Sequence, residues 1–239
     1  MLTTRLLRLP LAGLRGVARV CRRRADSVFT VDQTRWVVVV PVKGTAGAKS
    51  RLGAGAGRAA LADAFALDTV AALVAASAVE RVFVVTASAR LGVLLAALGA
   101  VIVPEVPGPE AGQDRLNAAI EQGAEAARFA CPDANLAVVT GDLPALHVAD
   151  VETAFALAAT HPLSMVADAE GVGTTTLLAQ AGYRFTPRFG LGSRAAHEGD
   201  GHVVLDLPPS SSLRRDVDTA ADLDTARALG LGPHTSELV

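Results

Sequence analysis

The chain is poor in three features that would have pointed to particular classes of protein. It has only two cysteines, Cys21 and Cys131, which lie far apart and match no metal-binding spacing. It has no basic surplus, since 22 basic residues stand against 24 acidic ones. No run approaches the roughly 18 apolar residues of a membrane span. A disulfide scaffold, a nucleic-acid binder and a membrane protein are therefore not favoured, and we expect a cytoplasmic protein.

The 239 residues suit one large domain, preceded by a segment of different composition. Residues 1–33 are rich in arginine and free of acidic residues until Asp26. A cleaved transit peptide has this composition. A disordered extension, or a stretch upstream of the true start codon, has it as well, and we favour these two alternatives. We predict an N-terminal extension over 1–33 and a single domain over 34–239.

From Trp36 onward, strand and helix patterns alternate. Apolar runs without polar alternation, such as Trp36–Val42 and Arg81–Ala87, are typical of strands buried on both faces. Between them lie segments with helical periodicity, over 57–77, 88–99, 114–130 and 148–160. Short strands and loops are expected over 171–180, 185–193 and 202–207. The pattern predicts an α/β fold with a mostly parallel central sheet and flanking helices.

A basic, small-residue loop follows the first predicted strand. The stretch "VKGTAGAKSRL" carries Lys43, Lys49 and Arg51 among glycines and alanines, which allow backbone amides to approach an anion. The loop lacks the Gly-Lys-Ser/Thr triplet of a P-loop and the G-x-G-x-x-G of a dinucleotide-binding turn. We interpret it as a phosphate-binding loop, the alternative being a solvated basic turn.

Carboxylates in two separate segments are candidate ligands for a divalent metal. Asp142 follows a buried strand in "VVTGDLPAL", at the sheet edge where ligands of such folds bind. Asp216 and Asp218 lie in "LRRDVDTAADL" and would face the same side of an extended segment. Mg²⁺ commonly needs only one or two carboxylates beside phosphate oxygens. The alternatives are helix caps, by Asp142 for the helix that follows it and by Asp218 or Thr219 for the last helix.

Two glycine-rich turns with hydroxyls and cations form a third candidate region. "EGVGTTTLL" contains Thr174 and Thr175, and "PRFGLGSRAAHE" contains Gly190 and Ser193 together with Arg188 and Arg194. Backbone amides, hydroxyls and guanidinium groups of this kind bind small anions. His197 and His202 are given no role.

Five motifs, taken in order, resemble those of the guanylyltransferases of deazaflavin coenzyme F(420) biosynthesis. They are the basic loop, "GDLP", "GVGTT", "RFGLGS" and "LRRDVDT". The resemblance spans roughly residues 36–232. It implies a nucleotide-diphospho-sugar transferase fold of the GT-A and MobA type. It also implies transfer of GMP from GTP to phosphoenolpyruvate, or to 2-phospho-L-lactate, with Mg²⁺ as the cofactor and the next enzyme of the pathway as a candidate partner.

The resemblance assigns roles to residues of this chain. The metal-binding aspartates fall on Asp142 and on Asp216 or Asp218, and Lys49 joins Asp142 and Asp216 as a catalytic candidate. The acceptor pocket falls on Thr174 or Thr175, Gly190 and Ser193, because the extra threonine of "GTTTLL" leaves the register open by one residue. The nucleotide-binding candidates are Lys43, Lys49, Arg51 and Asn117. A relative acting on a sugar phosphate or molybdopterin, and a non-catalytic nucleotide-binding module, remain as alternatives.

Overall fold

The computed structural model describes residues 35–42, 56–106, 108 and 111–239. The chain divides into two units, Met1–Val31 and Asp32–Val239, and the description below concerns the second unit. Lys43, Lys49 and Arg51, the predicted phosphate-binding cations, lie outside the described residues.

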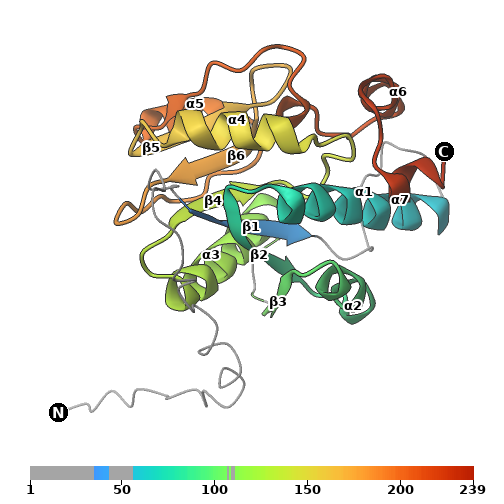
Figure 1. Cartoon of the computed structure of the whole chain (residues 1–239), viewed down its shortest axis with the longest axis horizontal. Helices are drawn as coiled ribbons and strands as arrows, with labels where there is room; N and C mark the ends of the chain where they lie inside the picture. The colour runs from blue at the N-terminus through green and yellow to red at the C-terminus, as the bar shows by residue number, and fades with distance from the viewer. Residues whose placement is uncertain (1–34, 43–55, 107, 109–110) are drawn as a thin grey trace, which may run out of the picture. The chain divides into compact units, whose positions relative to one another are not determined.

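A seven-stranded sheet forms the centre of the unit, with strand order β3-β2-β1-β4-β6-β5-β7. The strands are β1 (Trp36–Val42), β2 (Val79–Thr86), β3 (Val101–Pro104), β4 (Asn135–Val139), β5 (Leu163–Ala167), β6 (Thr174–Ala179) and β7 (Val203–Val204). Strands β3, β2, β1 and β4 are parallel, whereas β6 runs antiparallel to both of its neighbours, β4 and β5. Figure 1 shows β6 running against β1. The mostly parallel sheet predicted from the sequence is confirmed.

Helices cover both faces of this sheet (Figure 1). The helices are α1 (Ala56–Ala75), α2 (Ala89–Ala97), α3 (Gly112–Ala130), α4 (Val148–Ala158), α5 (Ser193–Gly199), α6 (Ala220–Leu229) and α7 (Pro233–Ser236), with a 3₁₀ turn at Ser212–Arg214. One apolar cluster joins α1, α2 and α4 to one face of the sheet, here called the α1 face. A second cluster joins α3, Phe185 and Phe189 to the opposite face, here called the α3 face.

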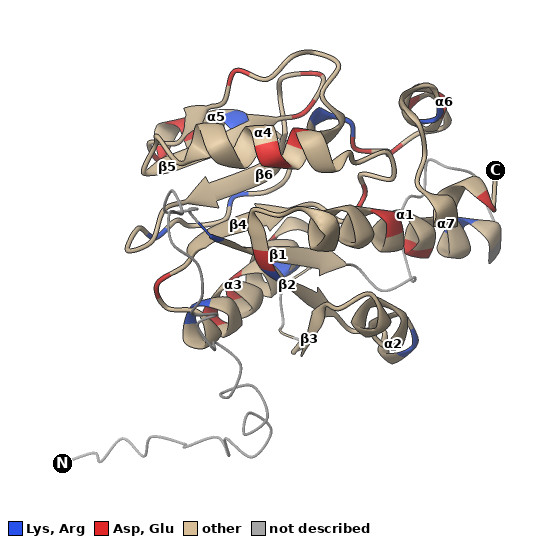
Figure 2. Cartoon of the chain, viewed as in Figure 1, with Lys and Arg blue, Asp and Glu red and all other residues tan. Residues whose placement is uncertain are grey.

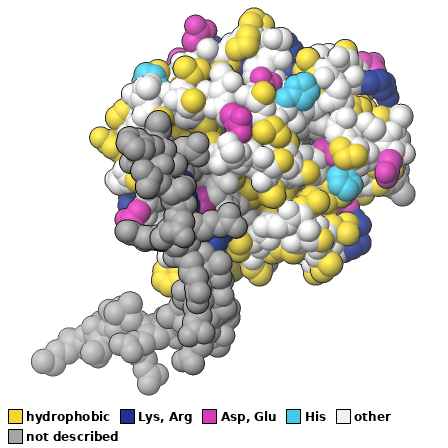
Figure 3. Space-filling model, in the orientation of Figure 1, with side chains coloured by type: hydrophobic (Ala, Val, Ile, Leu, Met, Phe, Trp, Pro, Cys, Tyr) yellow, Lys and Arg dark blue, Asp and Glu magenta, His cyan; other side chains and the backbone are white. Residues whose placement is uncertain are grey.

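The sequence of the strands explains why the sheet is covered on both sides. Val37 to Val40 of β1 are all buried, and successive residues point alternately into the two clusters. Among the described strands only β2 contains charged residues, Glu80 and Arg81 near its beginning (Figure 2). On the face shown in Figure 3, the basic and acidic side chains of the described residues are interspersed. No helix in the described part of the chain combines the length and apolarity needed to cross a membrane.

The segment after β6 differs in one respect from the sequence prediction. Residues 185–192 form an irregular loop, and Ser193–Gly199 form α5, which the sequence had not predicted. Seven residues give fewer than two helical turns, so no apolar periodicity is visible in "SRAAHEG". Gly192, with a positive φ of 72°, precedes the helix and directs the chain into it.

Close packing between α3 and the sheet depends on Gly123. A Cβ atom at this position would lie 2.4 Å from Val39 Cγ1 and 2.7 Å from Val85 Cγ2. We expect Gly123→Ala to lower the free energy of unfolding by about 1–3 kcal/mol, because the added methyl group overpacks a buried contact. Urea denaturation followed by circular dichroism measures this change.

Gly57→Ala in α1 is the matched control, because a Cβ atom there would have nothing within 4 Å. It should leave stability unchanged or raise it by up to about 1 kcal/mol through helix propensity. A Gly123→Ala variant as stable as the wild type would contradict the packing argument.

Candidate active site

Asp142 lies in a turn that several hydrogen bonds hold at the carboxyl end of β4. The amide of Thr140 donates to the Thr175 carbonyl at 2.9 Å. The amide of Leu143 donates to Thr69 Oγ1 at 3.1 Å. A Cβ atom on Gly141 would lie 3.2 Å from the Pro41 carbonyl oxygen of β1, so the turn fits closely against that strand. The predicted position of Asp142, at the ligand-binding edge of the sheet, follows from these contacts.

The structure brings the second carboxylate segment to the same place. The amide of Val217 donates to the carbonyl oxygen of Asp142 at 3.1 Å. The Val217 side chain is fully buried and packs with Phe65 and Ala145. Asp216 and Asp218 flank it, the first half-buried and the second exposed. Burial of Val217 therefore fixes the segment that carries both aspartates beside the Asp142 turn.

Helix capping does not account for these three aspartates. Helix α4 begins after His147, which makes no side-chain capping bond, so Asp142 is not its cap. Thr219 is the cap of α6, in a capping box with Asp222. Asp218 contributes only its backbone amide to that arrangement, as a donor to Asp222 Oδ2.

The donor set suits a magnesium ion. Carboxylate oxygens are the ligands that Mg²⁺ prefers, and one or two are enough when phosphate oxygens supply the others. Among the described residues, no group of three or more His, Cys, Asp or Glu side chains is placed to hold a metal ion. Asp142 and either Asp216 or Asp218 would supply carboxylate ligands of this kind, and the phosphates of a bound nucleotide would have to supply the others.

Thr174 and Thr175 contact two different parts of the molecule. Thr175 Oγ1 donates to the Leu213 carbonyl at 2.5 Å, in the segment that leads to Asp216. Thr174 Oγ1 lies 3.0 Å from His197 Nδ1 of α5. A register shift in the β5–β6 pairing falls at this point, between Val166 and Ala167. Thr174 is thus connected to the 188–193 loop region, and Thr175 to the carboxylate segment.

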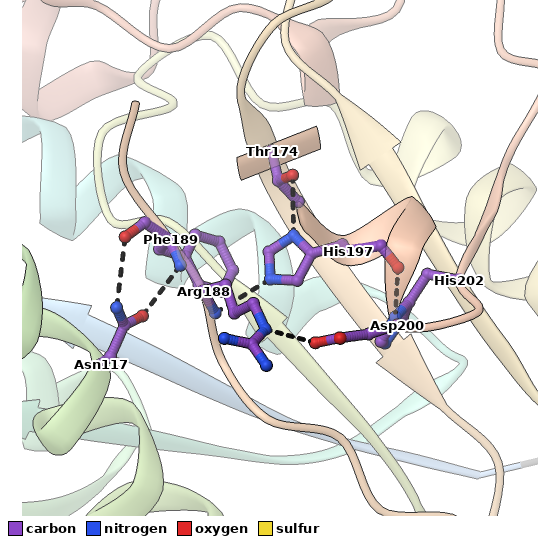
Figure 4. Close-up of polar contacts among 7 residues, drawn as sticks. All are labelled: Asn117, Thr174, Arg188, Phe189, His197, Asp200 and His202. Atoms are coloured by element: carbon purple, nitrogen blue, oxygen red, sulfur yellow. Dashed lines mark hydrogen bonds and ion pairs between the residues drawn. The ribbon is translucent and has the colours of Figure 1, made fainter. Parts of the chain in front are cut away.

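Gly190 lies in a loop that α3 holds in place, and Ser193 begins the helix α5 that follows this loop. Asn117 Nδ2 donates to the Phe189 carbonyl at 3.2 Å, and the Phe189 amide donates to Asn117 Oδ1 at 2.9 Å (Figure 4). Gly190 has a positive φ of 134°, and a Cβ atom there would lie 2.2 Å from Gln113 Cδ. The buried Ser193 donates its amide to the Gly190 carbonyl at 3.1 Å. Asn117, predicted to bind nucleotide, has its side-chain amide bonded to this loop.

A cleft of about 500 Å³ lies outside the loop, between it and α3. Its lining includes Gln113, Asp114, Asn117, Glu121, Arg188 and Phe189. Arg188 Nε donates to Asp200 Oδ2 at 2.5 Å, and Arg194 lies 3.6 Å from Glu198. These two arginines, which the sequence indicated as anion-binding cations, are therefore engaged in ion pairs.

His197 is the residue of this region that sequence reasoning missed. It is fully buried, and both ring nitrogens are in contact with polar groups, Nδ1 with Thr174 and Nε2 with the Arg188 amide at 3.0 Å (Figure 4). Burial, and next the neighbouring His202, lower the pKa of His197 to about 4, while Asp200 acts in the opposite direction. The ring is therefore neutral at pH 7.

His202 packs against His197, with the ring centroids 5.5 Å apart. Its Nδ1 lies 3.1 Å from the His197 carbonyl oxygen, to which it donates. Burial lowers the pKa of His202 as well. The signal in the sequence that bears on His197 is its four-residue spacing from Ser193, which places both residues on one face once the segment is recognised as a helix.

Comparison with solved structures shows the fold first. The fold is that of nucleotidyltransferases. A 4-diphosphocytidyl-2C-methyl-D-erythritol synthase matches with a TM-score of 0.56 at 13% identity, over 82% of this chain and 99% of that one. A cytidylyltransferase from Leptospira borgpetersenii matches with a TM-score of 0.51 at 14% identity, over 86% of this chain and 92% of that one. This confirms the fold predicted from the sequence.

The family is narrower than that class. The chain belongs to the family described as "Guanylyl transferase CofC like", whose family model matches residues 36–237. It is 48% identical to the phosphoenolpyruvate guanylyltransferase of Streptomyces scabiei, over 84% of this chain and 94% of that protein. It is 47% identical to the enzyme of the same name from Thermomonospora curvata, over 85% of this chain and 88% of that protein. The resemblance seen in the sequence motifs is confirmed, and the protein is an enzyme of the nucleotidyltransferase class.

The lowered pKa of His197 predicts a loss of stability in mild acid. An unfolded chain binds the proton near pH 6.5, whereas the folded protein does so only near pH 4. The unfolded state therefore binds more protons between these values, and stability falls as the pH drops from 6.5 to 4. His197 should contribute roughly 3 kcal/mol to this fall, and His202 adds in the same direction.

Urea denaturation of the wild type and of His197→Gln, at intervals from pH 8 to pH 4, measures this effect. The variant should lose less stability than the wild type between pH 6.5 and pH 4. Asp200, Arg188 and His202 are present in both proteins, so the difference between them reports His197 together with its coupling to these groups. Equal slopes for the two proteins would show that His197 does not titrate as described.

Proposed function

We propose that the chain transfers GMP from GTP to the phosphate of phosphoenolpyruvate and releases pyrophosphate. The observation that carries the proposal is the hydrogen bond from Val217 N to Asp142 O, which joins the two carboxylate segments at the carboxyl edge of the sheet. Beside them lie hydroxyls and backbone groups suited to a small anionic acceptor, at Thr174 and in the 188–193 loop. Relatives at 40–48% identity bear the name phosphoenolpyruvate guanylyltransferase, which supports this choice of acceptor.

The reaction needs little from the protein beyond placement and charge neutralisation. An oxygen of the acceptor phosphate attacks the α-phosphorus of GTP, and a new P–O bond forms. The bond between the α-phosphorus and the oxygen that bridges to the β-phosphate breaks, and the electron pair leaves with pyrophosphate. A phosphate monoester is largely ionised near neutral pH, so no general base is required.

Each proposed residue has a task in this reaction. Lys43, Lys49 and Arg51 would hold the GTP phosphates, with Lys49 stabilising the charge that develops, as the composition of their loop suggests. Asp142, with Asp216 or Asp218, would hold Mg²⁺. When bound, the ion supplies positive charge that neutralises the phosphate oxygens.

The acceptor would bind to Thr174, Gly190 and Ser193. We place Thr175 in a supporting role instead, because its hydroxyl donates a hydrogen bond to the Leu213 carbonyl oxygen. We propose Asn117 as a residue that orders this loop next to the nucleotide. The cytoplasm, where GTP and phosphoenolpyruvate occur, is the proposed compartment, and the next enzyme of deazaflavin coenzyme synthesis is the proposed recipient of the product.

The first test is pyrophosphate release by the purified protein with Mg²⁺ and GTP. We expect release with phosphoenolpyruvate, and a much smaller rate with 2-phospho-L-lactate or with no acceptor. The next enzyme and its deazaflavin acceptor are included to trap the unstable product. Release only with 2-phospho-L-lactate would change the assigned acceptor, and silence with both would overturn the proposal.

A second test concerns the carboxylate at the end of β4. Asp142→Asn should lower kcat by about a hundredfold or more, because it removes a charged ligand where phosphate charge must be neutralised. The fold should persist, since the Val217 amide bonds to the Asp142 backbone, which the substitution keeps.

Asp133→Asn is the matched control, because Asp133 is exposed and lies just before the first residue of β4, at the opposite end of this strand from Asp142. Its kcat should equal that of the wild type. An Asp142→Asn enzyme with full activity would remove Asp142 from the metal site.

A further inference from the structure

We propose that His197 is a positioning residue that sets Thr174 as a hydrogen-bond donor toward the acceptor anion. The proposal rests on the function proposed above, because the acceptor pocket belongs to that function. His197 links two segments that carry proposed acceptor-binding residues, because its Nδ1 contacts Thr174 of β6 and its Nε2 contacts the Arg188 amide, two residues before Gly190 (Figure 4).

The contacts of the ring determine which nitrogen carries the hydrogen. A backbone amide can only donate, so Nε2 must accept from Arg188 N and carries no hydrogen. In a neutral ring the hydrogen is then on Nδ1, which donates to Thr174 Oγ1 over 3.0 Å. The pairing of the two nitrogens leaves one tautomer.

This tautomer fixes what the threonine hydroxyl can do. Its oxygen accepts from His197, so its own hydrogen must point elsewhere. Within the described part of the chain, that hydrogen has an acceptor in Met165 Sδ at 3.8 Å, a weak acceptor of hydrogen bonds. An anionic oxygen of a bound acceptor would be a far better partner for that hydrogen. His197 thus prepares Thr174 to donate.

The surroundings keep the ring in this state and in this place. His197 is fully buried and lies four residues after Ser193 on α5, so both face the same side of the helix. Phe189 packs edge-on against it, with the centroids 5.3 Å apart, and Asn117 holds the Phe189 backbone from α3. The titratable and charged groups around the ring are His202, Asp200 and Arg188, the last two paired with each other.

Two amide substitutions separate the two contacts. His197→Gln can keep an acceptor near the position of Nε2 for the Arg188 amide, but it loses the donor to Thr174. His197→Asn can keep a donor near the position of Nδ1 and loses the acceptor. We expect His197→Gln to raise KM for phosphoenolpyruvate on the order of tenfold, with KM for GTP unchanged. His197→Asn should change KM for phosphoenolpyruvate less.

His202→Asn is the control, because Asn can still donate to the His197 carbonyl as His202 Nδ1 does. His202 Nε2 has no hydrogen-bond partner among the described residues, so the substitution removes no second hydrogen bond, although the ring contacts with His197 and Phe185 are lost. Both Michaelis constants should remain as in the wild type.

A double-mutant cycle completes the test. If His197 acts through Thr174, Thr174→Val should raise KM for phosphoenolpyruvate alone but add little in the His197→Gln background. Additive effects, or equal increases of both Michaelis constants, would show that His197 only supports packing. A wild type that does not react with phosphoenolpyruvate would instead overturn the proposed function.

A measurement on the wild type covers the case in which the variants do not fold. Long-range ¹H–¹⁵N correlation at pH 7 reports the tautomer of each histidine ring. We expect His197 to carry its hydrogen on Nδ1. A hydrogen on Nε2, or a doubly protonated ring, would overturn the positioning role.

Discussion

The antiparallel insertion of β6 between β4 and β5 is the constraint on which the candidate site depends. Because β6 runs against β4, its first residues meet the last residues of β4 at the same edge of the sheet. The bond from Thr140 N to Thr175 O continues this pairing into the Asp142 turn. A sixth strand parallel to the others would have placed Thr174 and Thr175 at the opposite edge. One change of strand direction thus joins the carboxylate region to the acceptor region.

The parallel half of the fold could be predicted because its strands are buried on both faces. Such strands appear in the sequence as continuous apolar runs, and the helices between them have the length that makes a period visible. The alternation of Asp216 and Asp218 could also be seen in the sequence, since alternate residues of an extended segment face the same side, but the burial of Val217 between them comes from the structure. The strand order was not accessible. The order depends on which strand edges pair with one another. Residues 163–207 contain only short strands, and their composition does not specify the strands with which they pair.

His197 could not be assigned from the sequence because its burial is created by several segments at once. The neighbouring residues in "SRAAHEGDG" are small or polar, which is typical of an exposed turn. Only after folding do β6, the 188–193 loop and His202 enclose the ring. Asn117 illustrates the same limit, since its contact with Phe189 spans 72 positions in the chain. A polar residue whose partners come from distant segments looks, in sequence, like any other surface residue.

The three consecutive threonines of β6 make different contacts because of a shift in strand register. Strict alternation would place Thr174 on the α1 face, with Leu178. Instead its hydroxyl lies near Met165, which belongs to the α3 face. The register shift opposite Val166 and Ala167 supplies the reason, because one extra residue in β6 reverses the direction of the side chains before it. The additional threonine is therefore what turns Thr174 toward His197 while Thr175 contacts Leu213, so neighbouring residues of one strand contact α5 and the segment that leads to Asp216.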